Sequence, residues 1–250
     1  YWALSRLHVV PALIWPRLSD AGRKMWRNFL PAAAGAGGMQ LNLLIDLVLA
    51  SLLPVGAISW LYYADRVAQL PLGVIGIALG TALLPKLSAA EAADQPSEVR
   101  NNLSEAIVFA GFFVIPAATG LVLCGLPIIK GLFVYGAFTV SDAKMAAMAL
   151  AAYGCGLPGF VMVKILQTAF YATGQPAAVL KISLITVAIN VAGSLSLMPT
   201  LGHVGLALAT AVSGTAAAAI MLYLLAQQHR LSVSFLPVCG KIMLASAVMA

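Results

Sequence analysis

Charged residues are scarce in this chain of 250 residues, because Asp, Glu, Lys and Arg together make up only 9% of it. Soluble domains carry roughly a quarter charged residues, so this composition excludes a water-soluble globular protein. The hydrophobic fraction is 62%, and the apolar runs approach or exceed the roughly 20 residues that cross a bilayer as a helix. They lack the strict alternation of a membrane β-barrel. The sequence therefore predicts an all-α, polytopic transmembrane helix bundle.

Cysteine is also rare, with three residues in the chain. Cys124, Cys155 and Cys239 stand apart in apolar surroundings, without a neighbour at metal-binding spacing. We expect them to be small buried hydrophobic side chains, and we expect no resident cofactor or certain metal site. Sequence motifs such as HExxH and GxSxG are missing, so we expect no enzymatic activity. The net charge of +6 is spread too thinly to indicate a nucleic-acid partner and fits loops that face anionic lipid.

Apolar length and Gly/Pro punctuation predict six whole membrane spans. They cover residues 29–53, 60–87, 103–126, 143–173, 177–198 and 204–228. We expect residues 1–28 to hold the end of a preceding transmembrane helix and a basic cytoplasmic linker. Residues 29–230 then form a six-helix lobe, and residues 231–250 begin a further, truncated transmembrane helix near Phe235. The chain is thus expected to be part of a longer protein.

Positive charge is distributed unequally between the two sets of loops. One set carries only Lys130 and Lys144. The other set carries Arg17, Arg23, Lys24, Arg27, Lys86, Arg100, Lys181, Arg230 and Lys241. Because loops rich in Lys and Arg face the cytoplasm, the second set is predicted to be cytoplasmic. Asp65 and Arg66 then lie just inside the outer end of the second span.

The stretch WLYYADRVAQLP, from Trp60 to Pro71, places an acid beside a base where charge is costly. One hypothesis is an interfacial pair that reaches water within an aromatic belt of Trp60, Tyr62 and Tyr63. The other is that Asp65 and Arg66 face a polar cavity and bind substrate. Adjacent helix residues point about 100° apart, so at least one of the two needs a further partner. The guanidinium fork of Arg66 suits phosphate oxygens.

Asp46 lies deep in the first span, where a lone carboxylate must be protonated, paired or bound to a cation. Asn190, Ser194 and Thr210 are polar residues of the fifth and sixth spans. These oxygens can form a site for a sodium ion or a proton. The alternative is ordinary hydrogen bonding between helices. Lys164, one helical turn from a glutamine, is a further intramembrane charge that can line the same cavity.

Glycines mark two of the spans. Gly73, Gly76 and Gly80 share one helical face, which predicts close packing against another helix. They are not a nucleotide-binding loop, because no strand precedes them and no Lys-Ser/Thr follows. The span 143–173 contains the sequence GCGLPG and is long enough to tilt or kink there.

The string SWLYYADRVAQLPLGVIGIALGTALLPKLS resembles the MurJ/MviN family of bacterial lipid II flippases, which belongs to the multidrug/oligosaccharidyl-lipid/polysaccharide exporter superfamily. The strings NLLIDLVLASLLPVGAISWLYYADR, LFVYGAFTVSDA and FYATGQPAAVLKI agree, so the resemblance covers nearly the whole chain. It implies two six-helix lobes around a central cavity, with extra C-terminal helices that form a groove for the lipid tail. This chain would be the C-terminal part, from the end of the sixth helix into the thirteenth.

The resemblance implies translocation of the undecaprenyl-pyrophosphate-linked peptidoglycan precursor, lipid II, from the cytoplasmic to the periplasmic leaflet by alternating access. Asp65 and Arg66 match the family's Asp-Arg pair and are expected to bind the pyrophosphate head group, with Lys164 in the same cavity. Asp46, Asn190 and Thr210 match a cation site known in some members. Ser194 stands where a second acid can occur, which weakens a sodium site. A sodium ion or a proton is the expected coupling ion.

The same resemblance places the protein in the bacterial inner membrane as a multi-pass protein. Lipid II and membrane lipids are the expected partners, and a monomer is the expected state. The alternative function is a cation-coupled drug or polysaccharide-lipid exporter of the same superfamily.

Overall fold

The computed structural model describes residues 20–228, so residues 1–19 of the predicted segment 1–28 and the whole predicted segment 231–250 lie outside the described part of the chain. Within it, regular structure is helical throughout. The helices are α2 (Asp20–Ser51), α3 (Ala57–Pro71), a π-helical segment η1 (Leu72–Ile77), α4 (Ala78–Ala92), α5 (Pro96–Leu123), α6 (Gly125–Phe133), α7 (Val140–Ala172), α8 (Pro176–Leu201) and α9 (His203–Gln227).

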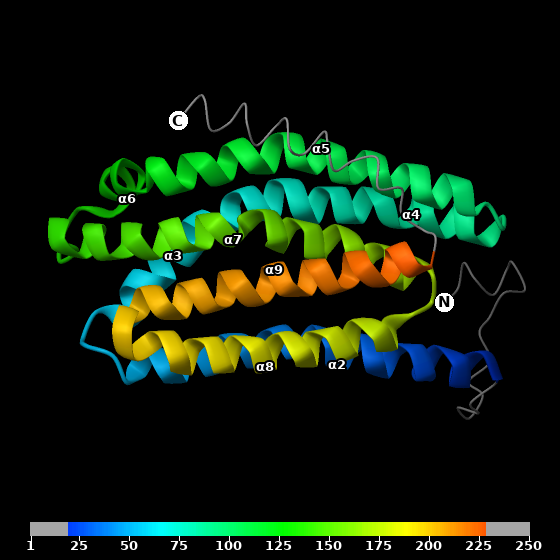
Figure 1. The fold of residues 1–250 in the computed structure, drawn as a ribbon, viewed down its shortest axis with the longest axis horizontal. Helices are drawn as coiled ribbons and strands as arrows, with labels where there is room; N and C mark the ends of the chain where they lie inside the picture. The colour runs from blue at the N-terminus through cyan, green and yellow to red at the C-terminus, as the bar shows by residue number, and fades with distance from the viewer. Residues whose placement is uncertain (1–19, 229–250) are drawn as a thin grey trace, which may run out of the picture.

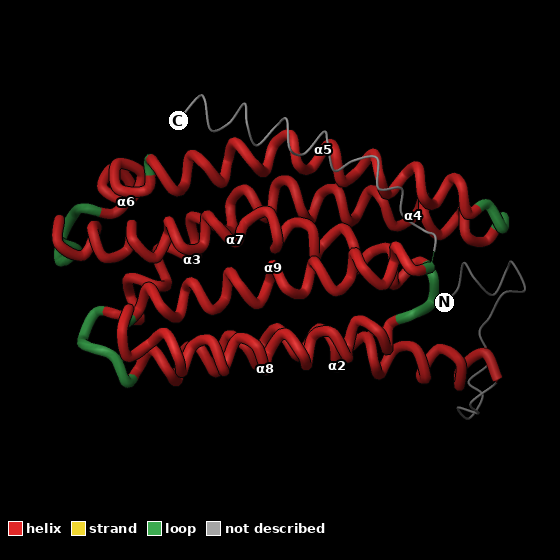
Figure 2. The backbone as a smooth tube through the Cα atoms, in the orientation of Figure 1, coloured by secondary structure: helices red, strands yellow, loops and turns green. Residues whose placement is uncertain are grey.

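The long helices lie roughly parallel or antiparallel in one elongated bundle (Figure 1). Helices α2 and α8 pack together on one side, α7 and α9 pack against each other in the middle, and α4 and α5 lie on the opposite side. Loops α2–α3, α6–α7 and α8–α9 gather at one end, whereas loops α4–α5 and α7–α8 gather at the other (Figure 2). The alternation matches the two loop sets that the sequence predicts.

Five helical segments of the described residues are long and apolar enough to cross a membrane. Four match predicted spans closely or extend them, namely Ala57–Ala92, Val140–Ala172, Pro176–Leu201 and His203–Gln227. The first predicted span, 29–53, differs from the structure in two ways. Helix α2 begins earlier, at Asp20, inside the predicted linker. Its apolar part, Asn42–Ser51, is shorter than a full membrane span. The linker residues Ala, Arg, Lys and Met favour helix, which explains the early start.

The third predicted span, 103–126, is confirmed as a span but has different ends. Helix α5 begins at Pro96, a residue type favoured in the first helical turn, and ends at Leu123. Cys124 leaves helical geometry, and the separate helix α6 follows at once. The apolar run continues across this break, so hydropathy alone did not reveal α6.

The second span is continuous over 36 residues but contains the π-helical turn η1 after Pro71. Proline has no N–H to donate to the preceding turn, and a local π-turn is one way in which a helix accommodates such a site. Two of the three glycines of this span face α7. A Cβ on Gly76 would lie 3.5 Å from Val161, and one on Gly80 would lie 3.2 Å from the Thr168 hydroxyl. Gly73 has nothing within 4 Å, so the packing prediction is confirmed for two glycines and wrong for Gly73.

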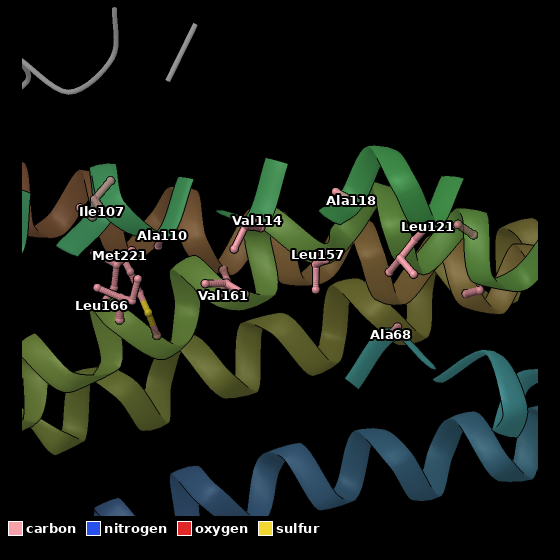
Figure 3. Packing of buried hydrophobic residues seen from close by; sticks show 14 of the residues in the cluster. Ala68, Ile107, Ala110, Val114, Ala118, Leu121, Leu157, Val161, Leu166 and Met221 are labelled. Carbon is pink, nitrogen blue, oxygen red and sulfur yellow. The ribbon is translucent and has the colours of Figure 1, made fainter. Parts of the chain in front are cut away.

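The core lies around α7, the most buried of the five candidate spans. Residues of α5 at three- and four-residue spacing face it (Figure 3). They are Ile107, Ala110, Val114, Ala118 and Leu121. Leu157, Val161 and Leu166 of α7 and Met221 of α9 complete this part of the core.

Helix α7 runs without interruption through the sequence GCGLPG, and its glycines serve close contacts instead. A Cβ on Gly156 would lie 2.6 Å from the Cβ of Ala211 on α9. A Cβ on Gly159 would lie 2.8 Å from the Cα of Thr215. The α7–α9 seam therefore depends on small residues, as membrane helix pairs commonly do.

The two described cysteines are exposed, so their predicted burial is wrong for Cys124 and Cys155. Lipid chains are as apolar as a protein core, so a small apolar side chain needs no cover from its own chain in a membrane.

Candidate functional site

Helix α3 holds the Asp-Arg pair close to the end of the bundle that the charge pattern predicts to face outward. Gln69 joins the two residues, because its Nε2 donates to Asp65 Oδ2 while its Oε1 accepts from Arg66 Nη1 at 3.3 Å. The guanidinium carbon of Arg66 lies 4.8 Å from the centre of the Tyr62 ring, one turn earlier. The further partner that the pair requires is thus Gln69, on the same helix. We call Tyr62, Asp65, Arg66 and Gln69 the arginine clamp.

The first turn of α3 is fixed by Trp60. Its Nε1 donates to Asp142 Oδ1 at 2.8 Å, and its ring lies 5.0 Å from the ring of His203 on α9. Asp142 is itself held by a capping box with Thr139 at the start of α7. Gly56 precedes α3 at φ 105, and a Cβ there would lie 2.7 Å from the Trp60 ring. Trp60 therefore ties α3 to α7 and α9.

The three residues of the aromatic-belt hypothesis differ in exposure. Tyr62 is 53% exposed, as a belt residue would be. Trp60 is half-buried in the contacts above, and Tyr63 stacks against Phe133 and Phe138 with ring centres 4.7 and 4.9 Å apart. These rings position α3 within the protein.

A cavity of about 360 Å³ opens between α2, α3, η1, α7, α8 and α9. Its charged lining residues are Asp65 and Lys164, and Asn42, Gln69, Tyr153, Gln167 and Thr210 are among its polar ones. The structure thus brings Asp65 and Lys164 to one cavity. Thr210, which donates a hydrogen bond to Asp46, lines the same cavity. Arg66 does not line it, because its exposed side chain points from a different face of α3.

Asp46, Thr210 and Asn190 form one hydrogen-bonded chain across α2, α9 and α8. Asn190 Nδ2 donates to Thr210 Oγ1 at 3.0 Å, and Thr210 Oγ1 donates to Asp46 Oδ2 at 3.1 Å. The Leu206 carbonyl is a second acceptor for the same hydroxyl at 3.0 Å. One hydroxyl hydrogen thus faces two acceptors, so the hydrogen-bond pattern can change with the protonation state of Asp46.

Four buried side-chain oxygens lack a hydrogen-bond partner among the described residues: Asn42 Oδ1, Asp46 Oδ1, Asn190 Oδ1 and Ser194 Oγ. Asn190 and Ser194 are fully buried. An unpaired buried oxygen is costly, and hard cations such as sodium bind oxygen ligands. Asp46 and Asn190 therefore each have an oxygen available as a ligand, while Ser194 lies one turn further along α8. The described residues contain no cluster of three or more His, Cys, Asp or Glu side chains for a transition metal.

Sequence reasoning found the charged residues and, for Asp46, its neighbours Asn190 and Thr210, but it missed Gln69 and Asp142. Gln69 lies four residues after Asp65 and three after Arg66, so helical spacing was the available signal. The hydrogen bond between Trp60 and Asp142 joins residues 82 positions apart, and no spacing in the sequence indicates that they meet.

The model of the protein family "Lipid II flippase MurJ" matches residues 2–250 of the chain. A protein of Rhizobium tropici named "Probable lipid II flippase MurJ" is 40% identical over 202 residues, which cover 81% of this chain and 38% of that protein. The chain thus spans less than half the length of this relative.

Two solved structures share the fold. The inward closed conformation of a lipid II flippase MurJ matches with a TM-score of 0.76 at 24% identity, covering 98% of this chain and 52% of that one. An outward-facing multidrug resistance transporter of the MATE family matches with a TM-score of 0.71 at 14% identity, covering 92% and 53%. The family match over nearly the whole chain decides between the two. With five candidate membrane spans in its described part, the chain belongs to the lipid II flippase MurJ family and is a multi-pass protein of the bacterial inner membrane.

Proposed function

We propose that the full-length protein containing this chain moves lipid II from the cytoplasmic to the periplasmic leaflet by alternating access. The proposal is supported by relatives named as lipid II flippases. The observation that carries it is the arginine clamp, which presents an exposed guanidinium on a membrane-spanning helix beside a cavity lined by Asp65 and Lys164. An arginine inside a membrane span costs free energy and usually has a functional role, and binding of a lipid-linked pyrophosphate is such a role.

The substrate's pyrophosphate is proposed to bind Arg66, with Lys164 as a second cation. Lys164 and Gln69 line the cavity, and Arg66 is joined to its edge through Gln69, so the two cations are proposed to contact the head group from adjoining surfaces. The rest of the head group would occupy the space between this lobe and the other half of the full-length protein. Asp65 fixes the clamp through Gln69 and keeps the local charge close to balance.

The coupling ion is proposed to be sodium or a proton at Asp46, with Asn190 and Thr210 as neighbours and Ser194 nearby. The two unpaired oxygens of Asp46 and Asn190 support this proposal. A charge that crosses the membrane potential supplies about 2.3 kcal/mol per 100 mV, which can drive one direction of the cycle. We further propose that the protein acts as a monomer, contacts membrane lipids, and transports without making or breaking covalent bonds.

Asp65→Ala and Arg66→Ala test the function in cells that depend on this flippase alone. Each substitution is expected to abolish or strongly slow growth, because the clamp loses an acid or its fork. Glu98→Ala and Arg100→Ala are matched controls, since this exposed acid and base lie at the start of α5, outside the cavity. Normal growth of both clamp variants at normal protein level would refute a substrate role for the pair.

Asp46→Asn tests the coupling site. The amide keeps the shape and one oxygen but cannot titrate, so transport is expected to lose its dependence on a sodium or proton gradient. The measurement is lipid II translocation in vesicles with imposed gradients, for wild type and variant. Equal gradient dependence in the two proteins would leave Asp46 with a helix-packing role only. Transport of a cationic drug but not lipid II by the wild type would favour the exporter alternative.

A further inference from the structure

The arginine clamp contains two residues whose roles remain unassigned, Gln69 and Tyr62. All four clamp residues lie on α3, and each contacting pair is three or four residues apart, so the unit forms within a single helix. Gln69 uses both ends of its amide, one toward the acid and one toward the base. Tyr62 covers one face of the guanidinium.

The amide of Gln69 can satisfy both neighbours in only one orientation. An ionised Asp65 accepts hydrogen bonds and Arg66 only donates them, so the NH₂ group must face Asp65 and the oxygen must face Arg66. A glutamate at position 69 would place a second carboxylate against Asp65. A leucine would leave both charges without this bridge. Glutamine is therefore suited to joining two opposite charges that point about 100° apart.

The contacts leave most of Arg66 available. Among the described residues, its one hydrogen bond goes from Nη1 to Gln69, and the Tyr62 ring lies against one face. A guanidinium has five N–H groups, so the remaining donors can take a phosphate in the two-pronged manner that distinguishes arginine from lysine. The ring and the amide hold the side chain at two points, although the side chain itself is exposed.

We propose, building on the proposed function, that Gln69 and Tyr62 are positioning residues that hold the Arg66 fork ready for the pyrophosphate of the substrate. A free arginine must lose rotamer freedom when it binds, and a pre-ordered one does so less. Loss of either holding contact is expected to weaken binding of the anion by about three- to tenfold, the fold-change that corresponds to ordering one long side chain.

The test measures binding of undecaprenyl diphosphate to the purified full-length protein in detergent. Gln69→Leu and Tyr62→Leu are expected to bind about three- to tenfold more weakly than wild type. Tyr62→Phe keeps the ring face and is expected to bind within about twofold of wild type. Tyr223 and Gln227 of α9 supply the matched control, because Gln227 Nε2 donates to the Tyr223 hydroxyl at 2.7 Å in the same i, i+4 arrangement. Tyr223→Leu and Gln227→Leu are expected to bind like wild type.

A double-mutant cycle separates positioning from general structure. If Gln69 acts through the fork of Arg66, Gln69→Leu has no further effect in an Arg66→Lys protein, because lysine has no fork to orient. Additive losses in the double variant would overturn the inference, and so would unchanged binding by Gln69→Leu. Failure of the wild type to bind undecaprenyl diphosphate would instead overturn the proposed function itself.

Discussion

Gly156→Ala tests the seam between α7 and α9, on which the shape of this lobe depends. The new Cβ would lie 2.6 Å from the Cβ and 2.7 Å from the Cα of Ala211. Non-bonded carbon atoms prefer separations of about 3.5–4.0 Å, so the two helices must move apart by about 1 Å. Neither helix can yield by a side-chain rotation, because the contacted atoms are a Cα and the Cβ fixed to it.

The matched control is Gly120→Ala in α5, where a Cβ meets nothing within 4 Å. Both substitutions replace a helical glycine and gain the same helix propensity, up to about 1 kcal/mol. The difference between the variants therefore isolates the packing cost. Overpacking of a well-packed site costs about 1–3 kcal/mol, and this is the expected difference in free energy of unfolding.

The assay is reversible denaturant unfolding of the full-length protein in detergent, with thermal midpoints as a second measure. Gly156→Ala is expected to be less stable than Gly120→Ala by that amount. Equal stabilities would refute a tightly packed seam at this position and would mean that α7 and α9 are further apart than the contacts with Ala211 require.

Two other predictions concern α3. Arg66→Lys keeps the charge but loses the planar guanidinium fork, so the translocation rate is expected to fall about tenfold, the effect of one lost charge-assisted hydrogen bond. Full activity of this variant would mean that Arg66 acts only as a point charge. Trp60→Phe keeps a ring against His203 but removes the donor to Asp142. Its thermal midpoint is therefore expected to fall below that of the control Trp26→Phe, whose exposed ring packs against Phe29. Equal midpoints would contradict the anchoring role of Trp60.

Membrane spans were predictable because length and hydropathy directly reflect the thickness of the bilayer. The alternation of loops followed from the same count and agrees with Figure 2. The break between α5 and α6 was not predictable, since Cys124 lies within an unbroken apolar run. The π-turn after Pro71 was also missed, and Gly73, which lies within it, does not pack closely as expected.

The charged residues of the candidate site were easier to predict than the residues that contact them. Asp46, Lys164 and the Asp65–Arg66 pair stand out because charge is rare in an apolar helix. Thr210 was predicted beside Asp46 although 164 positions separate them, because polar residues are also rare in these spans. The contact of Trp60 with Asp142, 82 positions away, was not predicted, because it depends on how the helices pack. Gln69 was missed although helical spacing alone would have placed it beside both charges.

The most direct test of the proposed function is translocation of fluorescently labelled lipid II by the full-length protein in sealed vesicles under an imposed membrane potential. Wild-type protein is expected to move lipid II between leaflets, and a protein with both Asp65→Ala and Arg66→Ala is expected to move it no faster than empty vesicles. The control with Glu98→Ala and Arg100→Ala is expected to match wild type. Equal rates for wild type and the Asp65/Arg66 double variant would contradict the claim that the clamp binds the transported head group.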